Sequence, residues 1–526
     1  MLARLKLFGS RLALPFACLI IIMVYVLMMD LKGIGTDEGF RLWIINGGQS
    51  LAPGETIAEA SWQRVLEANQ PHAYQPLYFL IQNSLMRILH TENLNLFRSV
   101  NLAFLGLCLL GLLALSREWR LVPRLFLLVV FSFNAYLLMH VLQIREYVAG
   151  IAIYIWSTFV VLELDRLALG RPRAAARWFA AYGVLLTTGF YLQSWVVFPA
   201  IGQGLFLLLR RRARWGRFLA LLVLAYAIVL CATLPYLKTH QQKVNVGHWA
   251  SEAESVQSHL SHGFHLVLAG HLANHANITE FLFWFWLVVI VSGAFLFLWD
   301  KTSASTLTVA MESRRQSLLM VLCIAVSLAF QLGYTLFVEN LAIWPRYFVI
   351  HYFFLTWLIA LSFRYLWELR AVFSAGWVHR GLTIAAGTVA AVLAVSTVYQ
   401  IRSYRADPYL DTGLSHNANF RNLAAALVRL IRPGDTVVMS DFINRATLTF
   451  TQPMANKIIL LAELEYGVPP VGRLIYVEPA GLRSQRDELA SHLHTEGYEA
   501  PVETTILAPD GVNVINDWRI LIFSRH

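Results

Sequence analysis

The sequence predicts a polytopic α-helical membrane protein of about eleven transmembrane helices, followed by a small α/β domain outside the membrane. Three observations lead to this fold class. The 526 residues are 57% hydrophobic and only 14% charged, with a mean hydropathy of +0.55, whereas soluble proteins carry about 25% charged residues. Long apolar runs alternate with short segments that carry arginine. From Ser403 onward the composition becomes that of a soluble domain.

The predicted spans follow one another with short connections. After a first helix that ends near residue 29, they cover approximately residues 97–115, 123–143, 147–164, 178–193, 195–209, 218–236, 280–299, 318–338, 347–363 and 381–400. The apolar run Tyr74–His90 is short for the ~20 residues of a span, and a span there would put the later arginines on the wrong side. It is therefore predicted as a helix at the outer interface, within a long first external loop of about residues 30–96.

Arginines between the spans set the predicted orientation. They are concentrated in segments such as Ser116–Arg124, Leu164–Trp178 and Arg364–Arg380, which the positive-inside rule assigns to the cytoplasm. The N-terminus is then cytoplasmic, residues 1–402 form the membrane domain, and residues 403–526 form the external α/β domain. The net charge of +10 belongs to this pattern, so nucleic acid is not expected as a partner.

The C-terminal part alternates helix and strand patterns. Helical periodicity covers Asn419–Asp435, and a polar helix is expected around Ser484–His494. Strand-like runs cover residues 436–440, 473–479, 503–511 and 518–525. This alternation is typical of a small α/β domain.

Asp37 and Glu38 are adjacent acids just after the first apolar segment, in the stretch Gly35–Trp43. The plain interpretation is a pair of solvated loop acids. However, the same loop continues with the interfacial helix that opens at Tyr74–Gln82, and a loop folded back on the membrane makes a partly enclosed chamber. A carboxylate there suits general-base chemistry, so both acids are candidate catalytic residues.

Two isolated arginines lie at helix ends that are predicted to be external: Arg145, and Arg346, which precedes Tyr347. An interfacial arginine can simply extend its charge into water. A guanidinium group also binds phosphate through two parallel hydrogen bonds. Because Asp37, Arg145 and Arg346 come from three segments but share one predicted membrane face, we expect a site for an anion there.

The second external segment, Leu237–Thr279, is rich in histidine. His262 and His265 are three residues apart, and His271 and His275 are four apart, so either pair can share a helix face and bind a metal. The alternative is an amphipathic surface helix with histidines among lipid headgroups. All four cysteines lie in apolar runs without paired spacing, which predicts neither a disulfide nor a cysteine metal site.

At these residues the chain resembles the GT-C superfamily of membrane glycosyltransferases, such as the protein O-mannosyltransferases, the lipid A aminoarabinose transferase and the oligosaccharyltransferase catalytic subunit. The matching motifs, over about residues 1–365, are Asp37-Glu38, Gln75-Pro76-Leu77-Tyr78, Arg98, Arg145 with Tyr147, and Arg346-Tyr347. The chain departs from the family in two places. Gln75 replaces the first proline of the usual pair, and Glu146 stands where metal-dependent members have Asp-x-Asp/Glu, which puts a divalent-metal requirement in doubt.

The resemblance implies a GT-C-like fold and an activity. The donor would be a sugar on a polyprenyl phosphate, and the acceptor a glycan, lipid or protein at the outer face of the membrane. Independently of the resemblance, the arginine bias favours a bacterial inner membrane, with the endoplasmic reticulum as the alternative. Asp37 would act as the base, with Glu38 as its support or as the alternative base. The residues assigned to donor and phosphate binding are Arg145, Arg346, Tyr347, Tyr78 and Arg98.

Three other classes compete with this interpretation. An O-antigen ligase or polymerase also uses polyprenyl-linked sugars, but such enzymes rely on a large late external loop. A transporter or lipid-linked sugar flippase predicts ionisable residues in the middle of spans. A non-catalytic scaffold predicts that loss of the acids is harmless.

Overall fold

The computed structural model describes most of the chain, and every structural statement below refers to this part. It comprises residues 2–29, 36–48, 60–70, 75–90, 93–167, 172–210, 215–241, 256–270, 276–299, 304–338, 345–372, 376–406, 420–439, 457–460, 473–479, 493–494, 498–499, 501–506 and 518–524. The chain divides into two compact units. We call Met1–Met29 with Arg98–Thr412 the first unit, and Asp30–Phe97 with Gly413–His526 the second unit.

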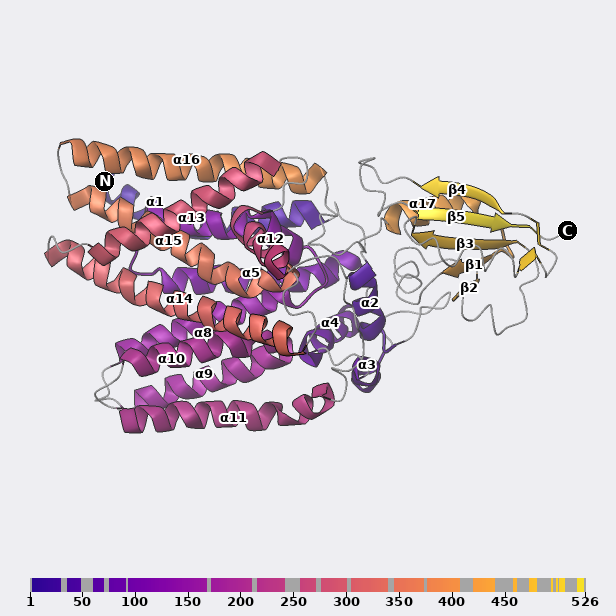
Figure 1. Ribbon diagram of the computed structural model, residues 1–526, viewed down its shortest axis with the longest axis horizontal. Coiled ribbons are helices and arrows are strands. Elements are labelled where there is room, and N and C mark those ends of the chain that lie inside the picture. Colours follow the sequence, from indigo (N-terminus) through magenta and orange to yellow (C-terminus); the bar gives the residue numbers. More distant parts are fainter. Residues whose placement is uncertain are drawn as a thin grey trace. The chain divides into compact units, whose positions relative to one another are not determined.

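The first unit is an assembly of helices (Figure 1). Its longer helices are α1 (Leu2–Met28), α5 (Leu94–Leu115), α6 (Leu121–Ser132), α7 (Ala135–Val141), α8 (Tyr147–Arg166), α9 (Pro172–Leu192), α10 (Val197–Arg210), α11 (Trp215–Gln241), α12 (Val256–Ala269), α13 (Ala276–Trp299), α14 (Ala304–Val338), α15 (Val349–Val372) and α16 (Trp377–Ala406). Every run predicted as a span contains one of these helices, and the run 123–143 contains two. In the described residues, six helices are long and apolar enough to cross a membrane, or seven if the bent pair α6–α7 counts as one span. The predicted helical architecture is therefore confirmed, and six or seven of the eleven predicted spans are helices of membrane-spanning length and composition among the described residues.

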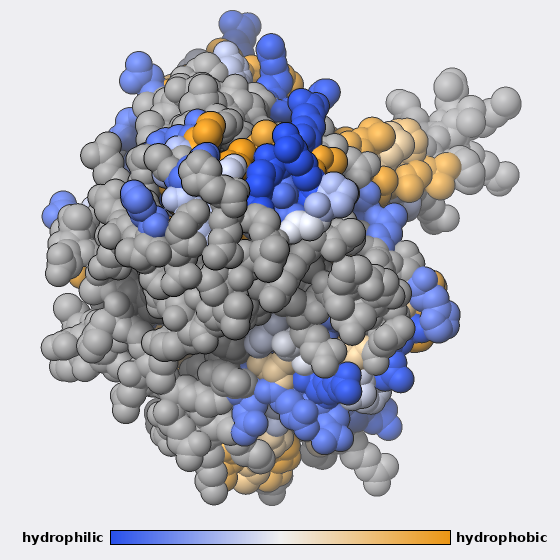
Figure 2. Space-filling view, turned by 90° about the vertical axis from the view of Figure 1, so that its right-hand side faces the viewer, coloured by the Kyte–Doolittle hydropathy of each residue, from blue (hydrophilic) through white to orange (hydrophobic). Residues whose placement is uncertain are grey.

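The helices of the first unit differ in how much apolar surface they expose. In the most apolar 18 residues of each helix, the buried share is 83% for α8 and 94% for α15. The same share is only 22% for α13 and for α16. Such exposed apolar helices suit lipid, since water would disfavour so much apolar surface. Figure 2 shows the molecule from the right-hand side of the view in Figure 1; where residues are coloured, groups of hydrophilic side chains alternate with hydrophobic ones.

The run predicted as the single span 123–143 is broken, which corrects that prediction. Helices α6 and α7 meet at an angle of 66°. Carbonyl groups freed at the break accept hydrogen bonds from tyrosines of other helices: Phe131 from Tyr352, and Ser132 from Tyr25 at 2.5 Å. Non-helical backbone at membrane depth is tolerated where protein satisfies its polar groups, which explains why the break is stable.

Arginines at the end predicted to be cytoplasmic join helices through ion pairs. The guanidinium of Arg166 on α8 lies 2.8 Å from Glu163 and 3.2 Å from Glu312 of α14. Arg364 of α15 lies 3.3 Å from the same Glu312. Some of the arginines in these segments therefore hold helix ends together through ion pairs.

In the second unit, the described residues of the segment predicted as the first external loop form three helices: α2 (Thr36–Ile45), α3 (Trp62–Asn69) and α4 (Pro76–Leu89). Helix α4 confirms the helix predicted over Tyr74–His90. The side-chain amide of Asn83 on α4 donates to the carbonyl oxygens of Ile45 and Ala60, both at 3.1 Å. This one side chain therefore joins α4 to the end of α2 and to the start of α3.

The C-terminal part of the second unit is a five-stranded mixed sheet with helix α17 (Phe420–Leu430). The strands are β1 (Thr436–Met439), β2 (Lys457–Leu460), β3 (Leu474–Pro479), β4 (Val502–Ile506) and β5 (Trp518–Phe523), in the order β2-β1-β3-β5-β4. Strand β1 is parallel to β2 and β3, and β5 is antiparallel to β3 and β4. The predicted α/β domain is confirmed with one strand more, β2, and nearly all of the helix expected around Ser484–His494 lies outside the described residues.

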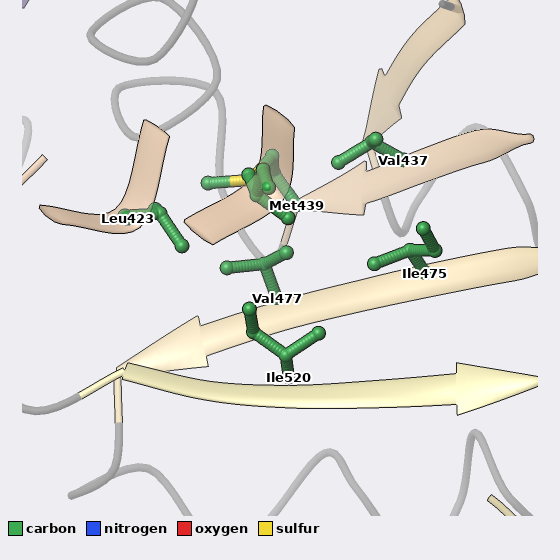
Figure 3. Packing of buried hydrophobic residues seen from close by; sticks show 7 residues of the cluster. Leu423, Val437, Met439, Ile475, Val477 and Ile520 are labelled. Carbon is green, nitrogen blue, oxygen red and sulfur yellow. The ribbon is translucent and has the colours of Figure 1, made fainter. Parts of the chain in front are cut away.

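Helix α17 covers one face of this sheet. Leu423 and Leu427 pack with Val437, Ile475 and Ile520, and all of these side chains are buried (Figure 3). On the other face, a second buried cluster consists of Val438, Leu474, Tyr476, Leu493, Tyr498, Leu521 and Phe523. Residues of both clusters alternate along the strands, because successive side chains of a strand point to opposite faces.

Candidate active site

The predicted acid pair opens helix α2. Asp37 and Glu38 are its second and third residues, where the helix dipole favours negative charge. The Glu38 side chain is buried, at 1% exposed. The side chain of Asp37 lies outside the described residues, so its role stays a prediction.

Helix α2 is buried along most of its length, which explains why Glu38 is covered. Leu42, Ile44 and Ile45 are all completely buried. Arg41 is 5% exposed and lies three residues after Glu38, a spacing that places two side chains side by side on a helix. At this spacing, the positive charge of Arg41 is expected to offset part of the cost of burying the carboxylate.

Tyr78 belongs to the junction between α4 and α5. It is completely buried, and its hydroxyl accepts a hydrogen bond of 3.0 Å from the side-chain amide of Gln82. The same amide nitrogen donates to the carbonyl oxygen of Phe97 at 2.9 Å. The contacts place Tyr78 within the packing of the second unit, and its predicted part in donor binding stays a prediction.

Arg98, near the start of α5, is buried at 2% exposed. Its guanidinium donates to the carbonyl oxygen of Met29 at 2.8 Å, just after the end of α1. Cationic side chains stabilise the C-terminal end of a helix by binding its last carbonyl groups. Arg98 therefore holds the chain at the point where it leaves α1.

Arg145 lies in the short loop between α7 and α8, and it is buried at 4% exposed. Its guanidinium carbon is 5.7 Å from the centre of the Tyr147 ring. The side-chain amide of Asn101 on α5 donates to the carbonyl oxygens of Gln143 and, at 3.4 Å, of His140. Helix α5, which carries Arg98 one turn before Asn101, thus holds the loop of Arg145 in place.

His140, which the sequence does not predict as a site residue, lies between two aromatic rings close to the predicted site residue Arg145. It is completely buried, and its ring lies 4.5 Å from that of Tyr136 and 4.8 Å from that of Tyr147, both edge to face. A lone histidine near the end of an apolar run gives little signal on its own. Only the fold shows that it belongs to the aromatic cluster beside Arg145.

Arg346 and Tyr347 form part of a short 3₁₀ helix, η5 (Pro345–Phe348). The Tyr347 ring stacks on Trp195 at a centroid distance of 4.9 Å, and its carbonyl oxygen accepts from Gln331 at 3.3 Å. The other end of the Gln331 amide, Oε1, lies 2.8 Å from Nε2 of His351, which must therefore be the donor. The Arg346 side chain lies outside the described residues, so its predicted phosphate contact is not tested.

The structure thus groups the predicted site residues within each unit. In the first unit, Tyr352 follows η5 closely and its ring lies 6.1 Å from that of Tyr136, so the η5 region adjoins the cluster beside Arg145. In the second unit, Glu38 and Tyr78 lie on α2 and α4, which Asn83 joins. In both units, side chains of packed helices hold the segments that carry these residues.

The histidine-rich segment shows no metal site in the part that the structure describes. No group of three or more His, Cys, Asp or Glu side chains in the described residues is placed to hold a metal ion. His265 on α12 instead lies 2.9 Å from Glu280 of α13 and 2.7 Å from the carbonyl oxygen of Ser261. His271 and His275 lie outside the described residues.

Comparison with known proteins supplies the fold family. No protein-family model and no curated protein matches the chain. ArnT from Cupriavidus metallidurans in the apo state matches with a TM-score of 0.57 at 13% identity, covering 99% of this chain and 98% of that one. ArnT bound to undecaprenyl phosphate matches with a TM-score of 0.54 at 11% identity, covering 97% of each chain. The chain therefore has the fold of the GT-C membrane glycosyltransferases, as its sequence motifs predicted.

Proposed function

We propose that this protein is a GT-C-type glycosyltransferase that moves a sugar from a polyprenyl-phosphate donor to an acceptor hydroxyl at the outer face of a membrane. The observation that carries the proposal is the match, over nearly the whole length, to an ArnT structure that binds undecaprenyl phosphate. The buried Arg145 beside an aromatic cluster supports it, because such a cation suits a lipid phosphate.

In the proposed reaction, the acceptor oxygen attacks the anomeric carbon while its proton passes to the carboxylate of Asp37. The bond between the anomeric carbon and the phosphate oxygen breaks, and its electron pair leaves with the polyprenyl phosphate. Arg145 and Arg346 stabilise the negative charge that grows on this phosphate. A single displacement of this kind inverts the anomeric configuration.

The two acids differ in their suitability as the base. Glu38 is 1% exposed, so an acceptor molecule has little access to its carboxylate. A general base must reach the proton that it removes, directly or through one water molecule. We therefore assign the proton transfer to Asp37 and a supporting role, within the packing of α2, to Glu38.

The proposal includes a placement in the membrane. All of the eleven apolar runs are taken to span it, with α1, α5, α8 to α11, α13 to α16 and the bent pair α6–α7 as the spans. The N-terminus is then cytoplasmic, and residues 1–402 form the transferase domain. The loop of about residues 30–96 and the domain 403–526 lie outside, in a bacterial inner membrane.

Replacement of Asp37 by asparagine tests the proposed base. Asp37→Asn keeps the shape of the side chain but removes its basicity, so sugar transfer from a polyprenyl-phosphate donor in membranes should fall by roughly a hundredfold or more. Glu67→Gln, the same type of change on the exposed side of α3, is the control and should transfer sugar normally. Full activity of Asp37→Asn at native expression would rule Asp37 out as the base.

A further inference from the structure

The first residues of α7 are held by a glutamine from α16, distant in the sequence. Oε1 of Gln400 accepts a hydrogen bond of 2.9 Å from the backbone N–H of Ala135. Nε2 of the same side chain donates to the carbonyl oxygen of Ala269, the last residue of α12. Gln400 is 2% exposed, so both ends of its amide are used inside the protein.

Asn134 makes a second connection between the same elements. Its Oδ1 accepts from the backbone N–H of Tyr136 at 2.8 Å, which caps α7. Its Nδ2 donates to the carbonyl oxygen of Val267 on α12 at 3.0 Å. Gln400 and Asn134 together satisfy backbone groups at the break of the bent span and at the end of α12. We call this pair with Gly270 the α7 clamp.

Gly270 makes room for the clamp. It ends α12 with a φ of +71°, a conformation that residues with a Cβ atom rarely adopt. A Cβ atom at this position would lie 2.1 Å from Oε1 of Gln400, much closer than atoms can approach. Glycine therefore permits both the turn and the approach of the Gln400 side chain.

We propose that Gln400 is a positioning residue for donor binding, because the α7 clamp fixes α7 and thereby the loop that carries Arg145. This inference rests on the proposed function, in which Arg145 contacts the lipid phosphate. Helix α7 has only 7 residues, and Arg145 follows its end by four positions, so a shift of α7 moves the loop directly. Small displacements of a binding group reduce rates strongly, as positioning of reacting groups is sensitive to errors of about 1 Å.

Gln400→Met tests the role, since methionine keeps the volume of the side chain but makes neither hydrogen bond. The expected result is a rise of roughly tenfold in the donor KM, with the acceptor KM unchanged. Hydrogen exchange at residues 135–146 in nanodiscs should become faster at the same time. In an Arg145→Gln background, Gln400→Met should add little, because the two changes act on one contact.

Gln316→Met is the matched control. Gln316 is also a completely buried glutamine on a long helix, and its amide also makes two hydrogen bonds, to Trp357 at 3.2 Å and Glu312 at 3.0 Å. It should change neither the donor KM nor exchange at residues 135–146. Gly270→Ala disturbs the α7 clamp from the end of α12 and should have the same effect as Gln400→Met. Agreement of the two variants would show that the effect does not come from a folding defect of one of them.

The outcomes separate the two proposals. If the native protein transfers sugar and Gln400→Met does not alter the donor KM, or alters it additively with Arg145→Gln, the positioning role is wrong and the proposed function stands. Equal effects of Gln316→Met and Gln400→Met also contradict the role, because they indicate general destabilisation. If the native protein neither binds nor uses the donor, both proposals fall, whatever the exchange at residues 135–146.

Discussion

At the residue scale, the proposed phosphate contact depends on the buried guanidinium of Arg145. It is 4% exposed and adjoins the ring of Tyr147, so its charge acts in surroundings of low dielectric constant. Its loop is fixed from α5 by Asn101. A cation held in this way needs little rearrangement to stabilise negative charge that develops nearby.

Arg145→Lys tests whether donor binding needs the planar guanidinium group or only a positive charge at this position. Lysine keeps the positive charge but lacks the planar donor fork and the ring contact of arginine. We expect the kcat/KM for the donor to fall by roughly 10- to 100-fold, which corresponds to the loss of one hydrogen bond to a charged group. Steady-state kinetics with varied donor measure this, and Arg87→Lys on the exposed side of α4 is the control. Unchanged kinetics of Arg145→Lys would remove Arg145 from the phosphate site.

Some residues of the candidate site can be predicted from the sequence, and others cannot. Arg145 and Tyr347 were selected because a charge or a motif interrupts an apolar run. Gln400 and His140 could not be selected in this way, because a lone polar residue in an apolar helix does not reveal its partner. Their partners, Ala135 with Ala269 and Tyr136 with Tyr147, become visible only in the folded chain.

At the element scale, the positions of helices were predictable but the break between α6 and α7 was not. The run 123–143 has no glycine, and its one proline is the first residue, so hydrophobicity predicts one continuous span. Three other helices hold the bend: Tyr25 and Tyr352 donate hydrogen bonds to carbonyl groups at the break, and Gln400 accepts one from the backbone N–H of Ala135. The local signal was Asn134, a residue type that favours helix N-caps.

In the sheet, strand β2 is the element that could not be predicted from the sequence. Its four residues, Lys457–Leu460, do not alternate between apolar and polar types, and no predicted helix leads into them, whereas the equally short β1 directly follows a predicted helix. The longer strands β3 and β5 were predicted from their apolar runs. Pairing with β1 in parallel, a contact between segments distant in the sequence, defines β2.

The ion pair between Asp435 and Arg473 makes the sheet sensitive to acid. Nη2 of Arg473 lies 2.6 Å from Oδ2 of Asp435, which also accepts from the backbone N–H of Arg432 at 2.7 Å. Burial raises the pKa of Asp435, but these hydrogen bonds outweigh it, so the pKa lies below its usual value. The unfolded chain therefore takes up this proton at a higher pH than the folded chain does.

It follows that Asp435 stabilises the fold fully above about pH 4, the ordinary pKa of aspartate, and that this contribution is lost as the pH falls through the folded pKa. Hydrogen exchange of β1 and β3, corrected for intrinsic rates, should show faster opening below pH 4. Asp435→Asn should be less stable at pH 7 and should lose much of this acid dependence. The same dependence in both proteins would assign the acid sensitivity to other groups.

At the scale of the whole molecule, this chain and ArnT share a fold although their sequences are very different. The match to apo ArnT covers 99% of this chain at 13% identity. The features that predicted the fold were likewise patterns, namely apolar runs, arginine distribution and the change of composition after Ser403. A shared fold does not by itself establish a shared reaction. Direct chemistry must therefore decide between a transferase and another protein that handles lipid-linked sugars.

The most direct test is to give the purified protein in nanodiscs a polyprenyl-phosphate sugar and candidate acceptors, and to quantify free polyprenyl phosphate by mass spectrometry. A glycosyltransferase predicts that this product appears in a one-to-one ratio with glycosylated acceptor, and that Asp37→Asn abolishes both. Donor that binds but remains intact with every acceptor, and that changes leaflet when the protein is placed in liposomes, would contradict the account and indicate a flippase.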